Sequence, residues 1–265
     1  MTHTMYPLIS TPMLANALQF AFEKATIEGK ATIGLLAILS LFSWTVIITK
    51  ARQLYRATKA SKAFFAIYRQ TRDPMEIFRK GSEYPGAPAY EVYDTGAEEL
   101  GYHLEHNPIS IKGKTRISAA SFDSVRVVLE RAVSAQALSL EKGMIVLSTA
   151  VSGGPFIGLL GTVWGVMETF SGIAKVQAAS LTAMAPGVAG ALIATVVGLF
   201  VAIPAMFAYN YMVTMVRAIT QELDNFAAEY ATAIEHNYAD NRSVSEEIAD
   251  AVRKTSDERR EPEFV

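Results

Sequence analysis

The hydrophobic positions of this 265-residue chain gather in three long windows that contain no Asp, Glu, Lys, Arg or His. The windows cover residues 31–49, 143–167 and about 186–209, and the last lies within an uncharged run between Lys175 and Arg217. A helix needs roughly 20 apolar residues to cross a bilayer. The pattern therefore predicts an all-α integral membrane protein with three transmembrane helices.

A weaker apolar stretch, residues 7–22, precedes the first window. Because Pro7 and Pro12 interrupt it, we interpret it as an interfacial helix rather than a fourth span. No basic segment precedes it, so a cleaved signal peptide is not expected. The first window is apolar on every side and is expected to face lipid, whereas the second and third are rich in small residues.

Basic residues are distributed unevenly around the three windows. Two lie before the first window, 15 between the first and second, one between the second and third, and six after the third. Under the positive-inside rule, this bias places the N-terminus outside and both residues 50–142 and the C-terminus in the cytoplasm. The sequence thus predicts a multi-pass membrane protein.

Helical spacing of apolar positions continues beyond the windows. From Ser121 it runs into the second window, which predicts one continuous helix, and after the third window it lasts until about Tyr238. Residues 84–88 break the pattern between helix-forming residues 51–80 and a short helix at about 91–104. The predicted organisation is an outer N-terminal segment (1–30), span 1 (31–49), a cytoplasmic helical region (50–142), span 2 (143–167), an outer turn (168–185), span 3 (186–209), a cytoplasmic helix (210–239) and a flexible tail (240–265).

Spans 2 and 3 each place small residues on one face. One stripe of span 2 repeats every seven residues and consists of Ser148, Pro155, Thr162 and Thr169. Beside it lies a glycine stripe that consists of Gly154, Gly158, Gly161 and Gly165. Span 3 repeats small residues every three or four positions, with Thr195 at their edge: Gly187, Ala191, Ala194, Gly198, Ala202 and Ala205. Such faces let helix backbones approach closely around a path. The alternative is packing alone, with each threonine hydroxyl bonded to the carbonyl four residues back.

None of the three windows contains a side chain that titrates near neutral pH. A threonine hydroxyl donates and accepts hydrogen bonds, but it does not take up and release a proton at physiological pH. If the protein uses an ion gradient, a second protein must supply the carrier. The sequence therefore predicts a partner helix that carries a carboxylate.

Composition narrows the classes of function. The net charge of −2 disfavours a nucleic-acid partner, and the absence of cysteine removes disulfides and thiol chemistry. No phosphate loop, nucleophile elbow or zinc motif is present, so neither an enzymatic activity nor a cofactor is expected. His103 and His106 are three residues apart but lack a third ligand, so no metal site is predicted.

Spans 2 and 3 also carry a specific motif. Its segments are EKG at 141–143, GLLGTVWGVM at 158–167, APGVAGALIAT at 185–195, GLFVAIPA at 198–205 and YN at 209–210. Together they closely resemble the MotA/TolQ/ExbB proton channel family, nearest to its ExbB and TolQ branch. The resemblance covers roughly residues 130–215.

The resemblance implies a homopentamer of three-span subunits in the lipid of the bacterial inner membrane, so the outer side, with the N-terminus, would be the periplasm. The pentamer would surround a dimer of an ExbD- or TolR-like partner whose transmembrane Asp carries protons. It implies that Thr162 and Thr195 line the proton path and hydrogen-bond water or the partner's carboxylate. The complex would use the proton motive force to energise outer-membrane transport or envelope maintenance through a TonB-like or TolA-like periplasmic arm.

One position departs from the family pattern. Members often carry Glu where this chain has Gly190, which leaves the partner's Asp as the sole obligatory carrier. Glu168, near the outer end of span 2, either attracts cations or is an ordinary interface charge. The prolines within the spans are expected to shape the helices: Pro155, Pro186 and Pro204.

Two hypotheses of different classes remain. The chain is a subunit of a proton-driven motor, or it is a passive scaffold whose small-residue faces only hold a single-span partner. Within the motor hypothesis, uptake of iron-siderophores or vitamins, envelope maintenance and export remain open. A flagellar stator is disfavoured, because that branch has its large charged cytoplasmic segment between the middle spans, whereas here it follows the first.

Overall fold

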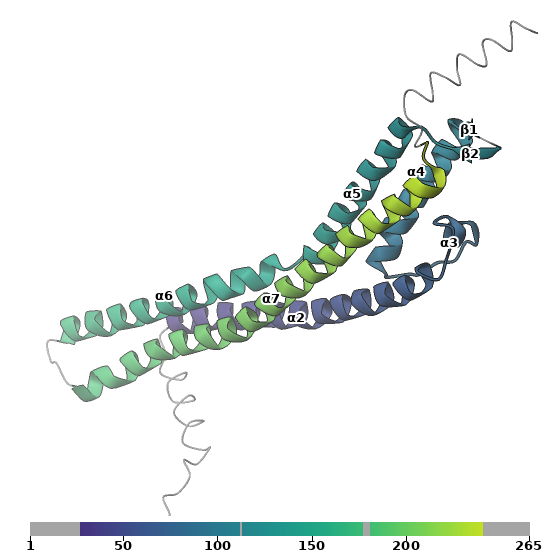
Figure 1. Cartoon of the computed structure of the whole chain (residues 1–265). Helices are drawn as coiled ribbons and strands as arrows, with labels where there is room; N and C mark the ends of the chain where they lie inside the picture. Colours follow the sequence, from purple (N-terminus) through teal and green to yellow (C-terminus); the bar gives the residue numbers. More distant parts are fainter. Residues whose placement is uncertain (1–26, 112, 177–180, 241–265) are drawn as a thin grey trace, which may run out of the picture. The chain divides into compact units, whose positions relative to one another are not determined.

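The computed structural model describes residues 27–111, 113–176 and 181–240 (Figure 1). Three of its helices are long and apolar enough to cross a membrane, namely α2, α6 and α7. The predicted interfacial segment and most of the predicted tail lie outside the described residues. The elements in chain order are α2 (Ile27–Tyr68), α3 (Glu76–Arg79), α4 (Pro88–His106), β1 (Ile109–Ile111), β2 (Lys114–Arg116), α5 (Ala119–Glu141), α6 (Ile145–Val176) and α7 (Leu181–Tyr238).

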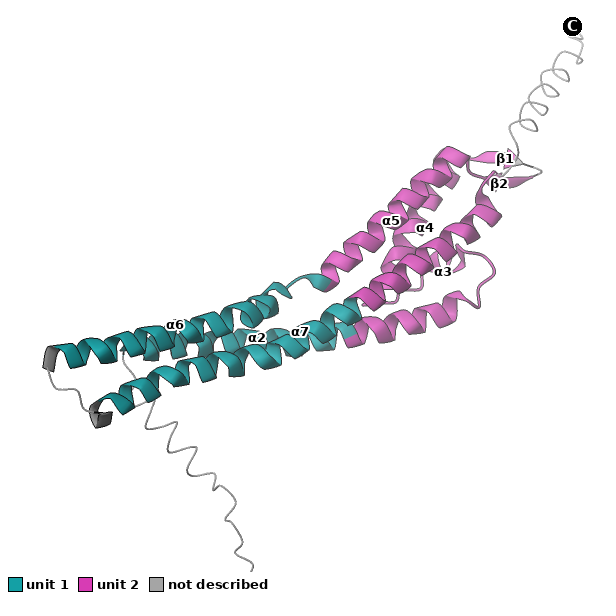
Figure 2. Cartoon of the chain, turned by 60° about the vertical axis from the view of Figure 1, so that its left-hand side comes forward, with its two compact units in different colours: residues 1–54, 141–216 teal, residues 55–140, 217–265 magenta. Residues whose placement is uncertain are grey.

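The chain forms two compact units (Figure 2). Unit 1 consists of the described parts of residues 1–54 and 141–216, so it contains the first part of α2, all of α6 and the first part of α7. Unit 2 consists of the described parts of residues 55–140 and 217–265. Helices α2 and α7 are each continuous across the sequence boundary between the units.

The helix predicted to run from Ser121 into span 2 is interrupted, so that prediction was wrong. Helix α5 ends at Glu141 and α6 begins at Ile145. Gly143, between them, has a φ of +89°, a left-handed conformation that glycine adopts without steric cost and that ends a helix. Of spans 2 and 3, only span 3 therefore continues without a break into the polar helix that adjoins it in sequence.

Helix α6 extends past the predicted end of span 2. It continues through Glu168 to Val176, and α7 begins at Leu181, so the turn predicted at 168–185 is mostly helical. The polar residues after Met167 end the apolar window but do not break the helix, because neither a glycine cap nor a proline follows them directly. Helices α6 and α7 also continue through their internal prolines, Pro155, Pro186 and Pro204.

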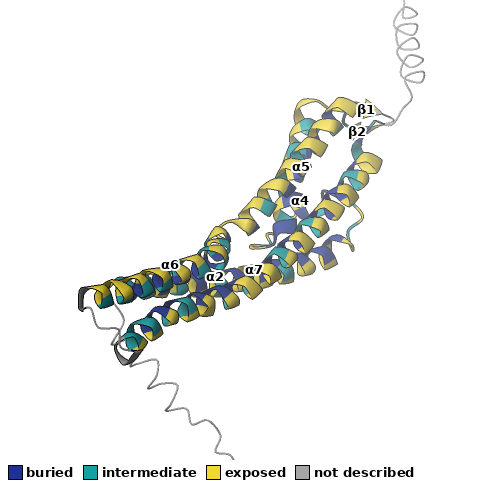
Figure 3. Ribbon diagram, turned by 90° about the vertical axis from the view of Figure 1, so that its left-hand side faces the viewer, coloured by how far each residue is buried: buried dark blue, intermediate teal, exposed yellow. Residues whose placement is uncertain are grey.

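Within unit 1, α2 has a packed stripe as well as an exposed one, although its sequence is apolar all round. Leu36, Ser43 and Lys50 follow each other at seven-residue spacing, and all three are buried. Leu41 and Trp44 are exposed. Figure 3 colours the described residues of the chain by burial. The expectation that the whole helix faces lipid is therefore wrong for the buried stripe, and for the exposed stripe it stays a prediction.

Unit 2 has a core of stacked and edge-on aromatic rings. Phe64 of α2 is fully buried. Its ring contacts aromatic rings of α2 itself, the ring of Tyr93 on α4 and the ring of Phe226 on α7. Tyr93 accepts a hydrogen bond from the backbone N–H of Phe78, 3.0 Å away, and burial raises the pKa of Tyr93 to about 12. The aromatic cluster comprises Phe64, Phe65, Tyr68, Tyr84, Tyr90, Tyr93, Phe226 and Tyr230.

A small antiparallel hairpin, β1–β2, lies in the region that was predicted to be helical. Ile109 pairs with Arg116 and Ile111 with Lys114, which leaves a two-residue connection. Gly113 in that connection has a φ of +76°, as short hairpin turns require. The helical prediction for residues 50–142 was therefore incomplete.

Candidate functional site

The glycines of α6 pack directly against the backbone of α7. A Cβ atom placed on Gly158 would lie 2.8 Å from the carbonyl oxygen of Ala194, and one placed on Gly154 would lie 3.1 Å from that of Gly198. A Cβ on Gly165 would lie 2.8 Å from the Cβ of Ala191. The structure thus brings together the two small-residue faces that the sequence singles out, and it leaves no room for a side chain at these positions.

At Gly161 a third helix joins the contact. A Cβ there would lie 2.6 Å from the Cβ of Ala194 on α7 and 2.7 Å from the Oγ1 of Thr32 on α2. Thr32 donates its own hydroxyl proton to the carbonyl of Gly29 at 2.8 Å. Thr32 was not expected at the site, because nothing in the uniformly apolar first span indicates which of its faces is packed.

Thr162 and Thr195 meet at the centre of this contact. Their hydroxyl oxygens are hydrogen-bonded to each other across α6 and α7. The Oγ1 of Thr162 also lies 3.2 Å from the carbonyl oxygens of Gly158 and Ala191, and the Oγ1 of Thr195 lies 3.2 Å from the same Gly158 carbonyl. The two hydroxyls and the two carbonyls form one small polar cluster between apolar helices.

The hydroxyl pair has two complete hydrogen-bond arrangements. Each hydroxyl carries one proton and accepts others. When Thr162 donates to Thr195, Thr195 donates to the Gly158 carbonyl; when Thr195 donates to Thr162, Thr162 donates to Gly158 or Ala191. Both arrangements leave every hydroxyl proton bonded, so the pair can reverse its direction without exposing an unsatisfied donor.

The remaining residues of the predicted polar stripe do not join this cluster. Ser148 donates to the carbonyl of Ile145, 3.0 Å away on its own helix, and at 1.5 Å per residue it lies about 20 Å along α6 from Thr162. Thr169 donates to Gly165 at 2.7 Å and contacts Gly187. Pro155 and Pro186 are half-buried within their helices. Only one hydroxyl of the stripe therefore pairs with the opposite helix.

The remaining candidate residues differ in their exposure. Glu168 is exposed, and Gly190 and Ala202 are buried. In unit 2, His103 lies 3.3 Å from Glu99, and no three His, Asp or Glu side chains gather into a metal-sized group among the described residues.

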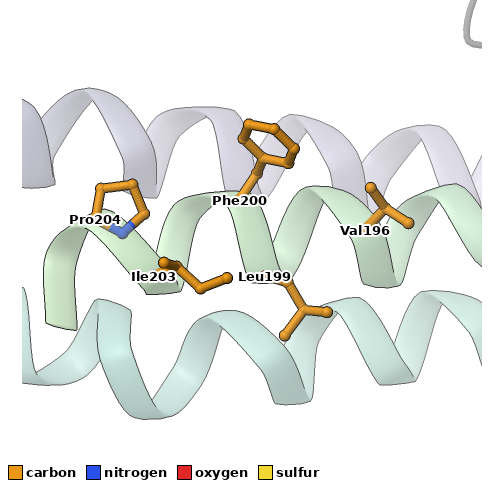
Figure 4. A pocket seen from close by; sticks show the side chains of 5 residues that line it. All are labelled: Val196, Leu199, Phe200, Ile203 and Pro204. Carbon is orange, nitrogen blue, oxygen red and sulfur yellow. The ribbon is translucent and has the colours of Figure 1, made fainter. Parts of the chain in front are cut away.

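An apolar groove of about 390 Å³ lies along α7, lined by five residues of that helix (Figure 4). Phe200 and Ile203 are exposed, and none of the lining side chains can hold a proton. The groove therefore belongs to the apolar outer surface and not to the polar cluster. Its lining residues are Val196, Leu199, Phe200, Ile203 and Pro204.

A second polar cluster, in unit 2, was not predicted from the sequence. The hydroxyl of Tyr238, the last residue of α7, donates to Asp73 Oδ1 at 2.7 Å and accepts from Arg79 at 2.9 Å. Arg79 also pairs with Asp73. Burial alone would raise the pKa of Asp73, but the hydrogen bonds from Tyr238 and the Met75 N–H, together with the charge of Arg79, hold that pKa below its usual value.

Comparison with known proteins places these features in a family. The model of the MotA/TolQ/ExbB proton channel family matches residues 103–225. The Tol-Pal system protein TolQ of Haemophilus influenzae is 34% identical over 219 residues, which are 80% of this chain and 91% of that protein. The chain belongs to the MotA/TolQ/ExbB proton channel family.

The relatives include both branches of the family. The biopolymer transport protein ExbB of Pseudomonas putida is 32% identical over 208 residues, which cover 78% of this chain and 60% of that protein. The TolQ protein of Pseudomonas aeruginosa is 32% identical over 197 residues, covering 74% of this chain and 82% of that protein. Family membership and the three membrane-length helices together identify a multi-pass membrane protein whose relatives are named for transport and Tol-Pal systems.

Proposed function

We propose that the chain is the proton-channel subunit of an inner-membrane motor of the ExbB–ExbD or TolQ–TolR kind. The observation that carries this proposal is the Thr162–Thr195 hydroxyl pair, which joins the glycine and alanine faces of α6 and α7. A hydrogen-bonded pair with two complete arrangements is suited to pass a proton along a path. Its position on packed helices holds the geometry fixed.

A partner supplies the titratable group of this path. Residues 143–167 and 186–209 contain no acidic or basic side chain, and a hydroxyl pair relays a proton without storing it. The expected partner is a dimer of single-span ExbD- or TolR-like chains, each with one membrane Asp, inside a homopentamer of this chain. The exposed apolar faces of α6 and α7, with Phe156 and Phe200 among them, are compatible with burial against neighbouring subunits and membrane lipid.

The proton motive force provides the work. Moving one charge through 100 mV releases about 2.3 kcal/mol, so several protons per cycle suffice to drive a conformational change. With the N-terminus in the periplasm and the C-terminus in the cytoplasm, a TonB-like or TolA-like arm would carry this work to the outer membrane. The result would be outer-membrane transport or envelope maintenance.

Valine substitutions of the two threonines test the proposal. In Thr162→Val, the Thr195 hydroxyl can still donate a hydrogen bond to the Gly158 carbonyl. In Thr195→Val, the Thr162 hydroxyl can still donate to the carbonyl of Gly158 or Ala191. Both variants should therefore fold and assemble. We expect proton flux through the reconstituted complex with its partner to fall at least tenfold in each. Thr162→Ser, which keeps the hydroxyl, is the matched control and should stay within threefold of the original chain.

The alternative function is a passive scaffold, which is favoured by the hydrogen bonds that already satisfy both hydroxyls within the chain. If both valine variants assemble and conduct like the original chain, the proposed role of these two side chains in the proton path is wrong, and the scaffold is favoured for this helix contact. Complementation of strains that lack either the TolQ or the ExbB function then separates envelope maintenance from outer-membrane transport.

A further inference from the structure

Glu28 has a buried oxygen without a hydrogen bond to any described residue. It lies in the first turn of α2 and is half-buried as a residue, yet its Oε2 atom is inaccessible to solvent and has no hydrogen-bond partner in the described part of the chain. Buried polar atoms in folded proteins are almost always hydrogen-bonded, and exceptions often mark a functional group. A carboxylate that only favours the start of a helix would remain hydrated.

Along the helix axes, Glu28 lies about one turn from the level of the hydroxyl pair. Thr32, one helical turn later on the same face, lies against Gly161, the neighbour of Thr162. Lys50, further along α2, lies against Gly143, so α2 and α6 run antiparallel. Four residues of helix correspond to about 6 Å, and Glu28 therefore lies about one turn beyond the level of Gly161, towards that of Gly165.

The charged groups near Glu28 are few. On α2 itself the next charged residue is Lys30, which is exposed, and on α6 the nearest acidic residue is Glu168, which is also exposed. The part of α7 from Met184 to Tyr209 carries no charged side chain. Neither the described part of α6 before Glu168 nor this part of α7 offers another carboxylate.

We propose that Glu28 is a proton-accepting site of this chain, which exchanges protons with the path at the Thr162–Thr195 pair. This inference rests on the proposed function, and it adds a carboxylate of the channel subunit to the one expected from the partner. The carboxylate takes up a proton from water at the N-terminal end of α2 and releases it, through water or Thr32, towards the hydroxyl pair. No bond other than those to the proton is made or broken.

The test compares Glu28→Gln with Glu168→Gln in the complex of the full chain with its partner in proteoliposomes. Glutamine keeps the shape of the side chain but does not titrate. We expect Glu28→Gln to lower proton flux at least fivefold and to flatten its dependence on the pH of the compartment facing the N-terminus, with partial recovery in Glu28→Asp. Glu168→Gln should stay within twofold. Flux and a pH profile in Glu28→Gln equal to those of the original chain would overturn the inference.

Carbodiimide labelling separates this inference from the proposed function. Dicyclohexylcarbodiimide reacts with protonated carboxyl groups in apolar surroundings, and peptide mass spectrometry locates the product. Label at Glu28 that decreases as pH rises supports the site even if the original chain conducts no protons, whereas absence of label at every pH overturns it. If Thr162→Val abolishes flux and Glu28→Gln does not, only the role of Glu28 fails.

Discussion

The two units of the chain bury opposite kinds of side chain. In unit 1, glycine and alanine lie in the helix contacts, while large side chains such as Phe156 and Phe200 are exposed. In unit 2, Phe64, Tyr93 and Tyr230 are fully buried. One polypeptide therefore contains two cores built by different rules.

The surroundings proposed for each unit, lipid for unit 1 and water for unit 2, would account for the difference. Lipid is as apolar as a leucine side chain, so α6 and α7 gain little from burying large residues and are held by close backbone contact instead. A unit in water gains about 25 cal/mol for each Å² of apolar surface that it buries, and aromatic rings bury the most. Enlarging a residue should therefore damage unit 1, and shrinking one should damage unit 2.

Shrinking the aromatic cluster should have the largest effect on stability. Phe226 contacts the rings of Phe64, Phe65, Tyr68 and Tyr230 and is 3% exposed. We expect Phe226→Ala to lower the free energy of unfolding by about 3–5 kcal/mol, measured by denaturant unfolding of the purified protein in detergent. Tyr55→Ala, which removes an exposed ring of the same unit, should change it by less than about 0.5 kcal/mol.

Enlarging the glycine face should have the next largest effect. A Cβ on Gly158 would lie 2.8 Å and 3.0 Å from backbone atoms of Ala194 and Thr195, and backbone cannot move aside as a side chain does. We expect Gly158→Ala to destabilise the protein by about 1–3 kcal/mol, seen as a lower melting temperature in detergent. Gly153 has no atom within 4 Å of its Cβ position, so Gly153→Ala should be neutral or stabilising. Equal melting temperatures for the two variants would show that α6 and α7 do not pack through this face.

The polar cluster at the end of α7 should have the smallest effect. Tyr238→Phe removes the hydrogen bonds to Asp73 and Arg79 and should cost about 1 kcal/mol. The pKa of Asp73 in the folded protein is below its usual 3.8. The ionised Asp73 therefore contributes fully to the free energy of unfolding above pH 3.8, and this contribution is lost as pH falls through the lowered pKa. The helical circular dichroism of the original chain should therefore not change between pH 8 and 5, and Tyr238→Phe should begin to lose structure at a higher pH on acidification. An unchanged acid transition would contradict this role of Tyr238.

The sequence predicts the helices of unit 1 well, because long uncharged windows have few alternatives in a membrane. It also predicts the facing small-residue stripes, since three- and four-residue spacing fixes which residues share a helix face. It does not predict the packed side of α2, because apolar residues on all sides give no difference between lipid contact and protein contact. Thr32 was therefore missed as a neighbour of α6.

The breaks in the helices were harder to predict than the helices. Gly143 has the position of a glycine C-cap. Because apolar residues recur at helical spacing both before and after it, the pattern offered no reason to end the helix there. The hairpin at 109–116 had a turn signal in Gly113 but strands of only three residues, too short to give an alternating pattern. The ring contacts of Phe226 and the Tyr238–Asp73–Arg79 cluster join residues more than 150 positions apart, which spacing along the chain does not reveal.

The three-helix contact at Gly161 limits how this protein can evolve. A Cβ there would lie 2.6 Å from the Ala194 Cβ on α7 and 2.7 Å from the Thr32 Oγ1 on α2, so both neighbours would have to shift or change. Most positions of a protein drift by independent single changes, whereas we expect a change at Gly161 to need compensating changes on two other helices. Intermediates of such a change would be unstable, so Gly161 should remain fixed over long periods even if it never takes part in the chemistry.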